Sequence, residues 1–393
     1  MTLDPTWRRH RTIRSAWRQR AISFHCVHFR PRAADRHLVT NIHQPLWGRS
    51  AAILLVLAVA VGASRCASRP RPAADLPVPR PAAPALTLRV EVEDQIGKGH
   101  RIQTIPLEDY VRGSVPAEMP LGEPDGLVAD RLARLQAILA RTYALANRGR
   151  HADEGFDLCS TTHCQVYSPP DRQPAAVARR VTAAVERTRD LIITDGHGPI
   201  LAVFHSDCGG HTSAATGVWG GPAPAYLLGV PDEFCVLTGR DDWQLSLDGD
   251  LLRRILNTSP GMQVGARLDR VTVLNRDAAG RATRVAVVGE EHHEIRGEQL
   301  RAAVSRQMGA RAFRSARFSV EREADEFLFR GKGFGHGVGL CQTGAIVRAR
   351  QGAAVETILT HYYPGTRLEP YLGPQTGAEP HTGQRRQARI RRR

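Results

Sequence analysis

The chain divides at a short apolar run that a stretch rich in proline and alanine follows. From Ala51 to Ala63 all 13 residues are apolar or small, and Arg49 precedes them. A helix that spans a membrane needs about 20 such residues, so this run favours the core of a signal peptide over a membrane anchor. Residues 69–85 are too rich in proline for a helix and predict an extended linker. The folded part is therefore expected to begin near Leu86.

These features predict an exported protein of the periplasm or cell envelope. Val61-Gly62-Ala63 offers small residues for cleavage of the signal peptide. The alternative is that the segment is retained as an anchor, which would be the protein's only contact with a membrane. Five segments are predicted: a basic extension at 1–50, a signal peptide or membrane anchor at 51–66, the linker at 67–85, one folded domain at 86–370 and a disordered basic tail at 371–393. We attribute the basic extension to a start codon placed too far upstream.

The positive charge of the chain is concentrated at its two ends. The formal net charge is +15, yet residues 1–50 hold ten arginines against two acids, and residues 384–393 hold six arginines and no acid. The residues between are close to neutral. A protein that binds nucleic acid carries a basic face on its folded part, so this distribution argues against a nucleic-acid partner.

Periodicity predicts an α+β fold with a mixed, β-rich core and several helices. Apolar and charged residues alternate over 88–92, which indicates a half-buried strand, whereas apolar residues recur with helical spacing over 125–149. Ala279-Gly280 predicts a hairpin over 270–289. A short helix or turn is predicted at 107–115. Further helices are predicted at 177–189, 296–308 and 344–351, and further strands at 191–194, 200–204, 318–320 and 327–329. Helices and strands do not alternate regularly, which favours α+β over α/β.

A single glutamate between two prolines is the first candidate for chemistry. Glu118 lies between Pro116 and Pro120 in SVPAEMPL. Proline fixes its own backbone and favours extended geometry in the residue before it, so we predict a short stiff segment that is not helical. Taken alone, Glu118 is either a solvated loop acid or a carboxyl group held for catalysis.

A glycine-rich stretch near the C-terminus is the second candidate. GKGFGHGVGLCQTGA, residues 331–345, surrounds His336 and Gln342 with glycines, which indicates a backbone that passes close to a ligand or another strand. A dinucleotide-binding loop is not favoured, because no acidic residue follows at the required distance. His336 either lines a binding site or holds the loop through hydrogen bonds to its backbone.

Five stretches, in order, resemble the stage II sporulation protein D family, which includes the amidase enhancers. The resemblance covers roughly Leu86 to Leu368. The stretches are LEDYV with SVPAEMP, the ARTYAL of the long helix, DLCSTTHCQVY, FHSDCGGHTS with VWGG and YLLGV, and GKGFGHGVGLCQTGA with ILTHYYPGT. On this resemblance, residues 86–370 are identified as a sporulation protein D-like catalytic domain.

The resemblance implies a lytic transglycosylase that acts on peptidoglycan glycan strands, with a preference for strands stripped of stem peptides. Glu118 matches the family's catalytic acid. One carboxyl group suffices, because the sugar's own C6 hydroxyl replaces the second carboxylate and the water of an ordinary glycosidase. Val115, Met119 and Leu121 are expected to bury Glu118 in part and keep it protonated near neutral pH.

Other side chains are expected to contact the glycan or orient Glu118. The predicted residues are Arg141, Tyr143, Ser206, His336 and Gln342. For Arg141 and Tyr143, packing within the fold is the alternative interpretation. Trp219, Tyr226 and Trp243 either stack on sugar rings or pack in the core.

Two cysteines and a histidine suggest a metal site. Zinc-binding members of the family suggest zinc at Cys159 and Cys164 with either His151 or His163; a disulfide between the two cysteines is the alternative. Such a zinc would be structural, so no cofactor is expected to be required for the chemistry.

The remaining cysteines of the folded part are Cys208, Cys235 and Cys341. Disulfides are the usual state in exported proteins, and Cys208 with Cys235 is a plausible bridge. Cys341 is interpreted as a small apolar loop residue.

The main alternative function is a catalytically silent protein that binds peptidoglycan and activates a cell-wall amidase. The intact Glu118 favours the enzyme, because a binding protein does not need this acid. A zinc-dependent hydrolase is a further alternative, in which chelation would abolish activity and Glu118→Gln would not. The expected partners are therefore glycan strands and, in the alternative, an amidase.

Overall fold

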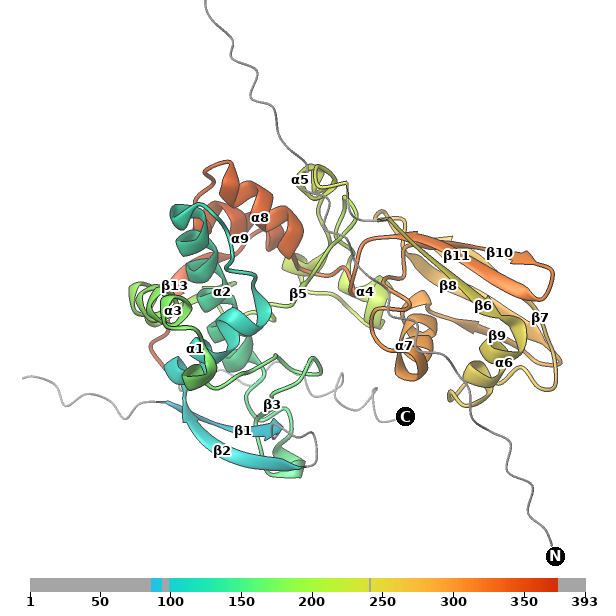
Figure 1. Cartoon of the computed structure of the whole chain (residues 1–393), viewed down its shortest axis with the longest axis horizontal. Coiled ribbons are helices and arrows are strands. Elements are labelled where there is room, and N and C mark those ends of the chain that lie inside the picture. Colours follow the sequence, from blue (N-terminus) through green and yellow to red (C-terminus); the bar gives the residue numbers. More distant parts are fainter. Residues whose placement is uncertain (1–85, 94–98, 240–241, 374–393) are drawn as a thin grey trace, which may run out of the picture. The chain divides into compact units, whose positions relative to one another are not determined.

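Helices and several small sheets make up the fold, which confirms the α+β prediction (Figure 1). The computed structural model describes residues 86–93, 99–239 and 242–373. The predictions for the extension, the signal peptide, the linker and the tail after residue 373 lie outside the described residues. The α-helices are α1 (Leu107–Glu118), α2 (Gly126–Ala146), α3 (Ala175–Arg187), α4 (Ala215–Trp219), α5 (Glu233–Val236), α6 (Gly249–Asn257), α7 (Gly297–Met308), α8 (Gln342–Arg350) and α9 (Val355–Tyr362).

The strands are short and lie between these helices along the chain. They are β1 (Thr87–Glu93), β2 (His100–Pro106), β3 (Leu158–Cys159), β4 (Leu191–Thr194), β5 (Phe204–His205), β6 (Asp242–Asp248), β7 (Leu268–Arg276), β8 (Ala282–Gly289), β9 (His292–Ile295), β10 (Phe318–Glu323), β11 (Glu326–Lys332), β12 (Leu340–Cys341) and β13 (Arg367–Pro370). Short 3-10 turns are η1 (Ala152–Glu154), η2 (Pro170–Arg172) and η3 (Ala225–Leu227).

The sheets join segments that lie far apart in the sequence. β1 pairs antiparallel with β2 and parallel with β3. β11 lies between β10 and β6, and β8 lies between β7 and β9, all antiparallel; the pair β7 and β8 is the predicted hairpin. β13 pairs with β4, and β12 runs parallel to β5. The last pair brings the end of the glycine-rich stretch beside the start of HSDCGG.

Helix α2 is the centre of the first hydrophobic core. Asp125 caps its N-terminus, because the carboxylate accepts hydrogen bonds from the backbone of Leu127 and Val128 at 2.8 and 3.4 Å. Most residues from Val128 to Ala144 are buried. In Figure 1, α2 lies beside α1, α3, α8 and α9, and it contacts each of them. The two ends of the domain therefore meet on one helix.

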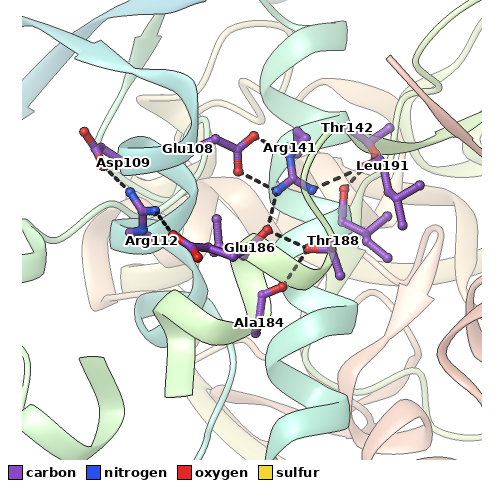
Figure 2. Close-up of polar contacts among 11 residues, drawn as sticks. Glu108, Asp109, Arg112, Arg141, Thr142, Ala184, Glu186, Thr188 and Leu191 are labelled. Carbon is purple, nitrogen blue, oxygen red and sulfur yellow. Dashed lines mark hydrogen bonds and ion pairs between the residues drawn. The ribbon is translucent and has the colours of Figure 1, made fainter. Parts of the chain in front are cut away.

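A buried ion pair joins α1 to α2 (Figure 2). Arg141, which is 0% exposed, donates to both carboxylate oxygens of Glu108 at 2.8 and 2.6 Å. Its guanidinium also donates to the carbonyl of Leu191 at 3.1 Å, where β4 begins. The bidentate geometry compensates for removing the two charges from water.

A second, more exposed set of charges joins α1 to α3 (Figure 2). Arg112 donates to Asp109 at 2.5 Å and to Glu186 of α3 at 3.2 Å. Exposed pairs of this kind stabilise little by themselves. Together with the Arg141 pair they set the orientation of α1, whose last residue is Glu118.

A second hydrophobic core forms between the β6–β10–β11 and β7–β8–β9 sheets and helices α6 and α7. Four phenylalanines, at 313, 318, 327 and 329, are each at most 2% exposed, and the ring of Phe313 contacts those of Phe318 and Phe329 edge-on. Both cores belong to one compact unit. Within the described residues, no helix is both long and apolar enough to cross a membrane.

The strand predicted at 200–204 is wrong for most of its length. The structure has only β5, Phe204–His205, and residues 200–203 run as irregular backbone. Leu201 and Val203 are half-buried and Ala202 is fully buried, so the apolar run reflects burial rather than pairing. The predicted helix at 344–351 is α8, and a further helix, α9, follows it.

Candidate active site

Glu118 is the last residue of helix α1, and Pro116 lies inside this helix. The prediction of a non-helical segment is therefore wrong. Proline has no N–H to donate, so the carbonyl of Arg112, four residues earlier, loses its helical partner. The side-chain amide of Gln173 donates to that carbonyl at 3.0 Å. This bond from a distant loop replaces the missing helical bond, and α1 continues through Pro116 to Glu118.

The carboxyl group of Glu118 is half-buried, with one oxygen held by the backbone. The N–H of Val166 donates to Oε1 at 2.5 Å. Burial raises the pKa of Glu118 above its usual value of 4.5, and the hydrogen bond from Val166 opposes this rise in part. The C-terminal end of a helix also carries partial negative charge, which disfavours the carboxylate there. A protonated Glu118 is thus favoured beyond the pH range of an ordinary glutamate.

The surroundings of Glu118 are apolar and aromatic. Val115 and Met119, which flank it on α1 and at its cap, are at most 1% exposed. Tyr110 is also buried, and burial raises its pKa well above the usual value, with contributions from charges on Tyr143, Cys164 and Glu118. Tyr143, a predicted site residue, and Glu118 both act on the pKa of Tyr110.

Gln342 also contacts Glu118, through the backbone. The side-chain amide of Gln342, at the first position of α8, donates to the carbonyl oxygen of Glu118 at 2.6 Å. The contact joins the glycine-rich stretch to the PAEMP stretch, which lie 224 positions apart. The structure thus brings the predicted residues Gln342 and Glu118 together.

Ser206 lies next to Gln342 at the end of β5. Its carbonyl accepts hydrogen bonds from the backbone N–H and the hydroxyl of Thr343, each at 3.0 Å. Its side chain is exposed. Asp207, which follows, is buried, and burial raises its pKa to about 7; its Oδ1 accepts from the N–H of Gly209 at 2.9 Å.

His336 holds the glycine-rich stretch together. Its Nδ1 accepts from the N–H of Val338 at 3.1 Å, and its ring lies 5.5 Å from that of His205 and 5.2 Å from that of Trp219. Burial lowers the pKa of His336 to about 4, so the ring is neutral at pH 7. At Gly337 a side chain would clash, because a Cβ would lie 2.2 Å from Nε of Arg281.

Arg141 is not at the exposed part of the site. Its guanidinium is buried against Glu108 and the carbonyls of Leu191 and Val185. This position corresponds to the packing alternative that the sequence left open. Tyr143 lies one helical turn before Asn147. The hydroxyl of Tyr143 accepts a hydrogen bond from the guanidinium of Arg150 at 3.4 Å.

Four side chains that suit a metal ion converge in and near the loop that leads to Val166. The ligand atoms of His151, Cys159, His163 and Cys164 all lie within 4.8 Å of one another. Nε2 of His151 lies 3.2 Å from the sulfur of Cys164, and Nδ1 of His163 lies 3.6 Å from that of Cys159. The sequence suggested one of the two histidines; the structure brings both to the cysteines, whose thiols are free.

The donor set of this cluster matches zinc. Two thiolates and two imidazoles are a common set for a structural, tetrahedral zinc site. Nδ1 of His151 contacts the carboxylate of Glu154 at 2.9 Å, which directs Nε2 toward the cluster, as carboxylates do behind metal-binding histidines. The cluster loop also continues directly into Val166, the residue that bonds Glu118.

The aromatic residues proposed as stacking platforms are mostly packed. Trp243 is 8% exposed, with its ring 5.2 Å from Phe313 and its Nε1 donating to Ser315 at 3.3 Å. The hydroxyl of Tyr226 accepts from the N–H of Leu201 at 3.2 Å. Two surface hollows, one beside Trp243 and one along β7 and β8, are lined by none of the residues that surround Glu118.

Sequence reasoning missed two groups that hold Glu118. One is the backbone N–H of Val166, which carries no side-chain signal. The other is Gln173, which stands in an ordinary loop segment before α3. The presence of Pro116 inside a helix could have suggested a search for a side-chain donor of this kind.

The chain is similar to known proteins over much of its length. A family model described as a stage II sporulation protein matches residues 95–194, and a model described as a domain of unknown function (DUF8618) matches residues 242–339. Stage II sporulation protein D of Bacillus amyloliquefaciens is 30% identical over 285 residues, which cover 68% of this chain and 76% of that protein. An uncharacterised protein of Brachyspira hyodysenteriae is 30% identical over 276 residues, which cover 69% and 68%.

A more distant relative is the amidase enhancer of Bacillus subtilis. It is 26% identical over 304 residues, which cover 66% of this chain and 40% of that protein. The segment that the stage II sporulation protein model matches, residues 95–194, contains Glu118, the His151 cluster and Gln173.

Proposed function

This chain belongs to the stage II sporulation protein D family, and from that premise we propose that it is an exported lytic transglycosylase of the cell envelope. Its substrate is the glycan strand of peptidoglycan, stripped of stem peptides. Glu118 is its general acid and base. The observation that carries the proposal is the half-buried carboxyl group of Glu118 at the end of α1, with one oxygen on the Val166 N–H and its pKa raised by burial.

The reaction needs only one carboxyl group. Protonated Glu118 gives its proton to the glycosidic oxygen between N-acetylmuramic acid and N-acetylglucosamine, and the bond from C1 to that oxygen breaks. The C6 hydroxyl of the muramic acid attacks C1, and the Glu118 carboxylate takes its proton. The products are a 1,6-anhydro end and a free 4-hydroxyl, and Glu118 returns to its protonated form. The tethered hydroxyl replaces a bound water.

The groups around Glu118 hold it for both steps. The Val166 N–H binds Oε1, which leaves Oε2 for the proton transfers, and it stabilises the carboxylate once the proton has left. Gln342 fixes the backbone of Glu118. Ser206 is exposed beside the start of α8, and we assign it to glycan contact. His336, neutral and packed, is assigned to holding the loop.

We further propose a structural zinc held by His151, Cys159, His163 and Cys164. Bound there, the ion would cross-link the loop between β3 and Tyr167. The loop would then present Val166 to Glu118 with a fixed geometry. No step of the reaction uses the metal, so chelation is expected to lower activity through the position of Val166.

The test compares the purified chain with Glu118→Gln on peptide-free glycan strands, with products identified by mass spectrometry. Asp125→Asn is the matched control, because it removes a nearby carboxylate and keeps a good helix cap. We expect anhydro-muramic ends from wild type and Asp125→Asn, and a rate lower by about 10²–10⁴-fold from Glu118→Gln. Reducing ends would instead indicate hydrolysis by an activated water.

The second candidate function is a non-catalytic activator of a cell-wall amidase. It is favoured by the likeness to a protein named amidase enhancer. In that case neither wild type nor Glu118→Gln would cleave glycan strands, both would bind them, and both would raise the rate of an amidase equally.

A further inference from the structure

A second cluster of metal-binding side chains lies apart from the His151 cluster. The ligand atoms of Cys208, Asp232, Cys235 and Cys341 all lie within 4.8 Å of one another, and each residue is 0% exposed. The sulfur of Cys341 lies 3.6 Å from that of Cys235, and the sulfur of Cys208 lies 3.5 Å from Oδ2 of Asp232. Three thiols and the Asp232 carboxylate thus meet in a site closed to solvent, and the sulfur of Cys235 also lies 3.2 Å from Oδ1 of Asp207.

Backbone groups are directed at the sulfurs. The N–H of Cys208 donates to the sulfur of Cys341 at 3.3 Å, as does that of Gly344 at 3.4 Å, and the N–H of Gly210 donates to the sulfur of Cys208 at 3.3 Å. A neutral thiol is a weak acceptor, whereas a thiolate is a good one. Hydrogen bonds to sulfur are typical of metal-bound thiolates.

Among the described residues, the carboxylate in the cluster is paired with a single cation, Arg348. A buried carboxylate is costly unless it is paired or bound to a metal. Asp232 accepts from the Tyr362 hydroxyl on Oδ2 at 2.8 Å; its Oδ1 makes no hydrogen bond, with Nη2 of Arg348 3.6 Å away. Arg348 can balance the charge of Asp232 only. Three cysteine thiolates in the same cluster would need a further positive charge.

A disulfide does not account for the cluster. The bridge suggested by the sequence, Cys208 with Cys235, is absent from the structure, in which both thiols are free. A bridge between any two of the sulfurs would leave the third as a free thiol, 0% exposed, beside Asp232. Cys341 is also no loop residue, because it ends β12 and its sulfur caps α8 by accepting the N–H of Gly344.

We propose that Cys208, Cys235, Cys341 and Asp232 bind a zinc ion. Three thiolates and one carboxylate give a closed, four-coordinate set, which suits a structural zinc rather than a catalytic one. The ion would join three segments: the loop after β5, helix α5 and the N-terminus of α8. Gly344 permits this close approach, because a Cβ there would lie 2.1 Å from Oδ2 of Asp232.

The site also has a consequence for catalysis, which rests on the proposed function. Cys341 immediately precedes Gln342, the residue whose amide binds the carbonyl of Glu118. Cys208 lies two residues after Ser206. A metal here would therefore fix, from the buried side, the segments that carry Ser206 and Gln342 next to the catalytic acid.

The test measures metal content and does not depend on activity. The full chain is reduced, loaded with Zn²⁺ alone, freed of excess metal and analysed by atomic emission. We expect two equivalents of zinc in wild type. Cys208→Ser and Asp232→Asn are each expected to lower the content of the loaded protein to one equivalent, and Cys159→Ser, from the other cluster, to do the same independently. The combination Cys159→Ser with Cys208→Ser is expected to hold none.

Several results would overturn the proposal. Wild type with a single equivalent, lost in Cys159→Ser and kept in Cys208→Ser, would assign all zinc to the His151 cluster. A peptide that links Cys208 to Cys235 in a non-reduced digest of the protein as secreted would assign the sulfurs to a disulfide. A wild-type content of two equivalents needs no substitution to interpret, so misfolding of a variant does not affect that result.

Discussion

The side-chain amide of Gln173 donates a 3.0 Å hydrogen bond to the carbonyl of Arg112, the carbonyl that Pro116 leaves without a helical partner. The bond explains how helix α1 contains Pro116 and still ends on Glu118. It also makes the position of Glu118 depend on a residue 61 positions away from Arg112.

Gln173→Leu is expected to destabilise the protein through this carbonyl. The substitution keeps the size of the side chain and leaves the Arg112 carbonyl unsatisfied, at a cost of about 1–3 kcal/mol. In a Pro116→Ala background the cost should be smaller, because alanine at this position supplies the helical N–H. Urea unfolding of the four proteins gives the coupling energy directly.

Gln307→Leu on α7 is the control, since Gln307 is an exposed glutamine. Equal destabilisation by Gln173→Leu in both backgrounds would mean that Pro116 and Gln173 are not coupled.

Glu118→Gln is expected to stabilise the fold at high pH while it lowers the rate of catalysis. The folded-state pKa of Glu118 is raised above its usual 4.5, so ionisation costs more in the folded than in the unfolded chain. The penalty is absent below pH 4.5 and complete once the pH exceeds the folded pKa. It amounts to about 1.4 kcal/mol for each pH unit that separates the folded from the unfolded pKa. Glutamine removes it.

Thermal unfolding at pH 8 and at pH 4 tests whether the ionised Glu118 destabilises the folded protein. The variant should melt above wild type at pH 8, and the difference should shrink at pH 4. A variant less stable than wild type at pH 8 would show that the carboxylate is stabilised by its surroundings.

The sequence predicts those elements whose causes are local. Helix α2 follows from its apolar spacing and from Asp125 as cap, and the β7–β8 hairpin follows from its alternation around Gly280. The helical state of Pro116 could not be predicted, because its cause is a side chain from another segment. The apolar run at 200–203 has the composition of a strand, yet burial alone explains it.

The candidate site likewise contains some residues that the sequence predicts and others that it does not. Motifs indicate Glu118 and Gln342, and the structure joins them. The role of Val166 depends on a backbone N–H, which any residue but proline provides, so no residue type marks it. Arg141 illustrates the converse, since the sequence left open whether it contacts the glycan or packs within the fold, and the structure pairs it with Glu108.

Glu154→Gln is expected to weaken zinc binding at the His151 cluster. The Glu154 carboxylate holds Nδ1 of His151 at 2.9 Å, and loss of such a partner typically lowers metal affinity by about 10–100-fold. Competition with a chromophoric chelator measures the affinity of the His151 cluster for zinc. The zinc of this cluster is identified as the equivalent that is missing from Cys159→Ser.

Asp171→Asn is a matched control, because it removes an exposed acid on η2. An affinity unchanged in Glu154→Gln would exclude the carboxylate as the group that orients His151.

Arg141→Met is expected to destabilise the protein severely without a direct effect on substrate. Removing one partner of a buried pair leaves Glu108 uncompensated, at a cost of about 3–5 kcal/mol. The double variant Arg141→Met with Glu108→Leu should regain much of this stability, though the Leu191 carbonyl stays unsatisfied. Arg284→Met, at an exposed pair with Glu294, should cost at most about 1 kcal/mol.

The same double variant separates the two interpretations of Arg141. If Arg141 only holds α1 against α2, the repaired protein should cleave glycan strands with KM close to that of wild type, because Glu118 keeps its position. A folded double variant whose KM rises while kcat is retained would instead assign Arg141 to the glycan. Denaturant unfolding and initial rates on the same preparations decide between these outcomes.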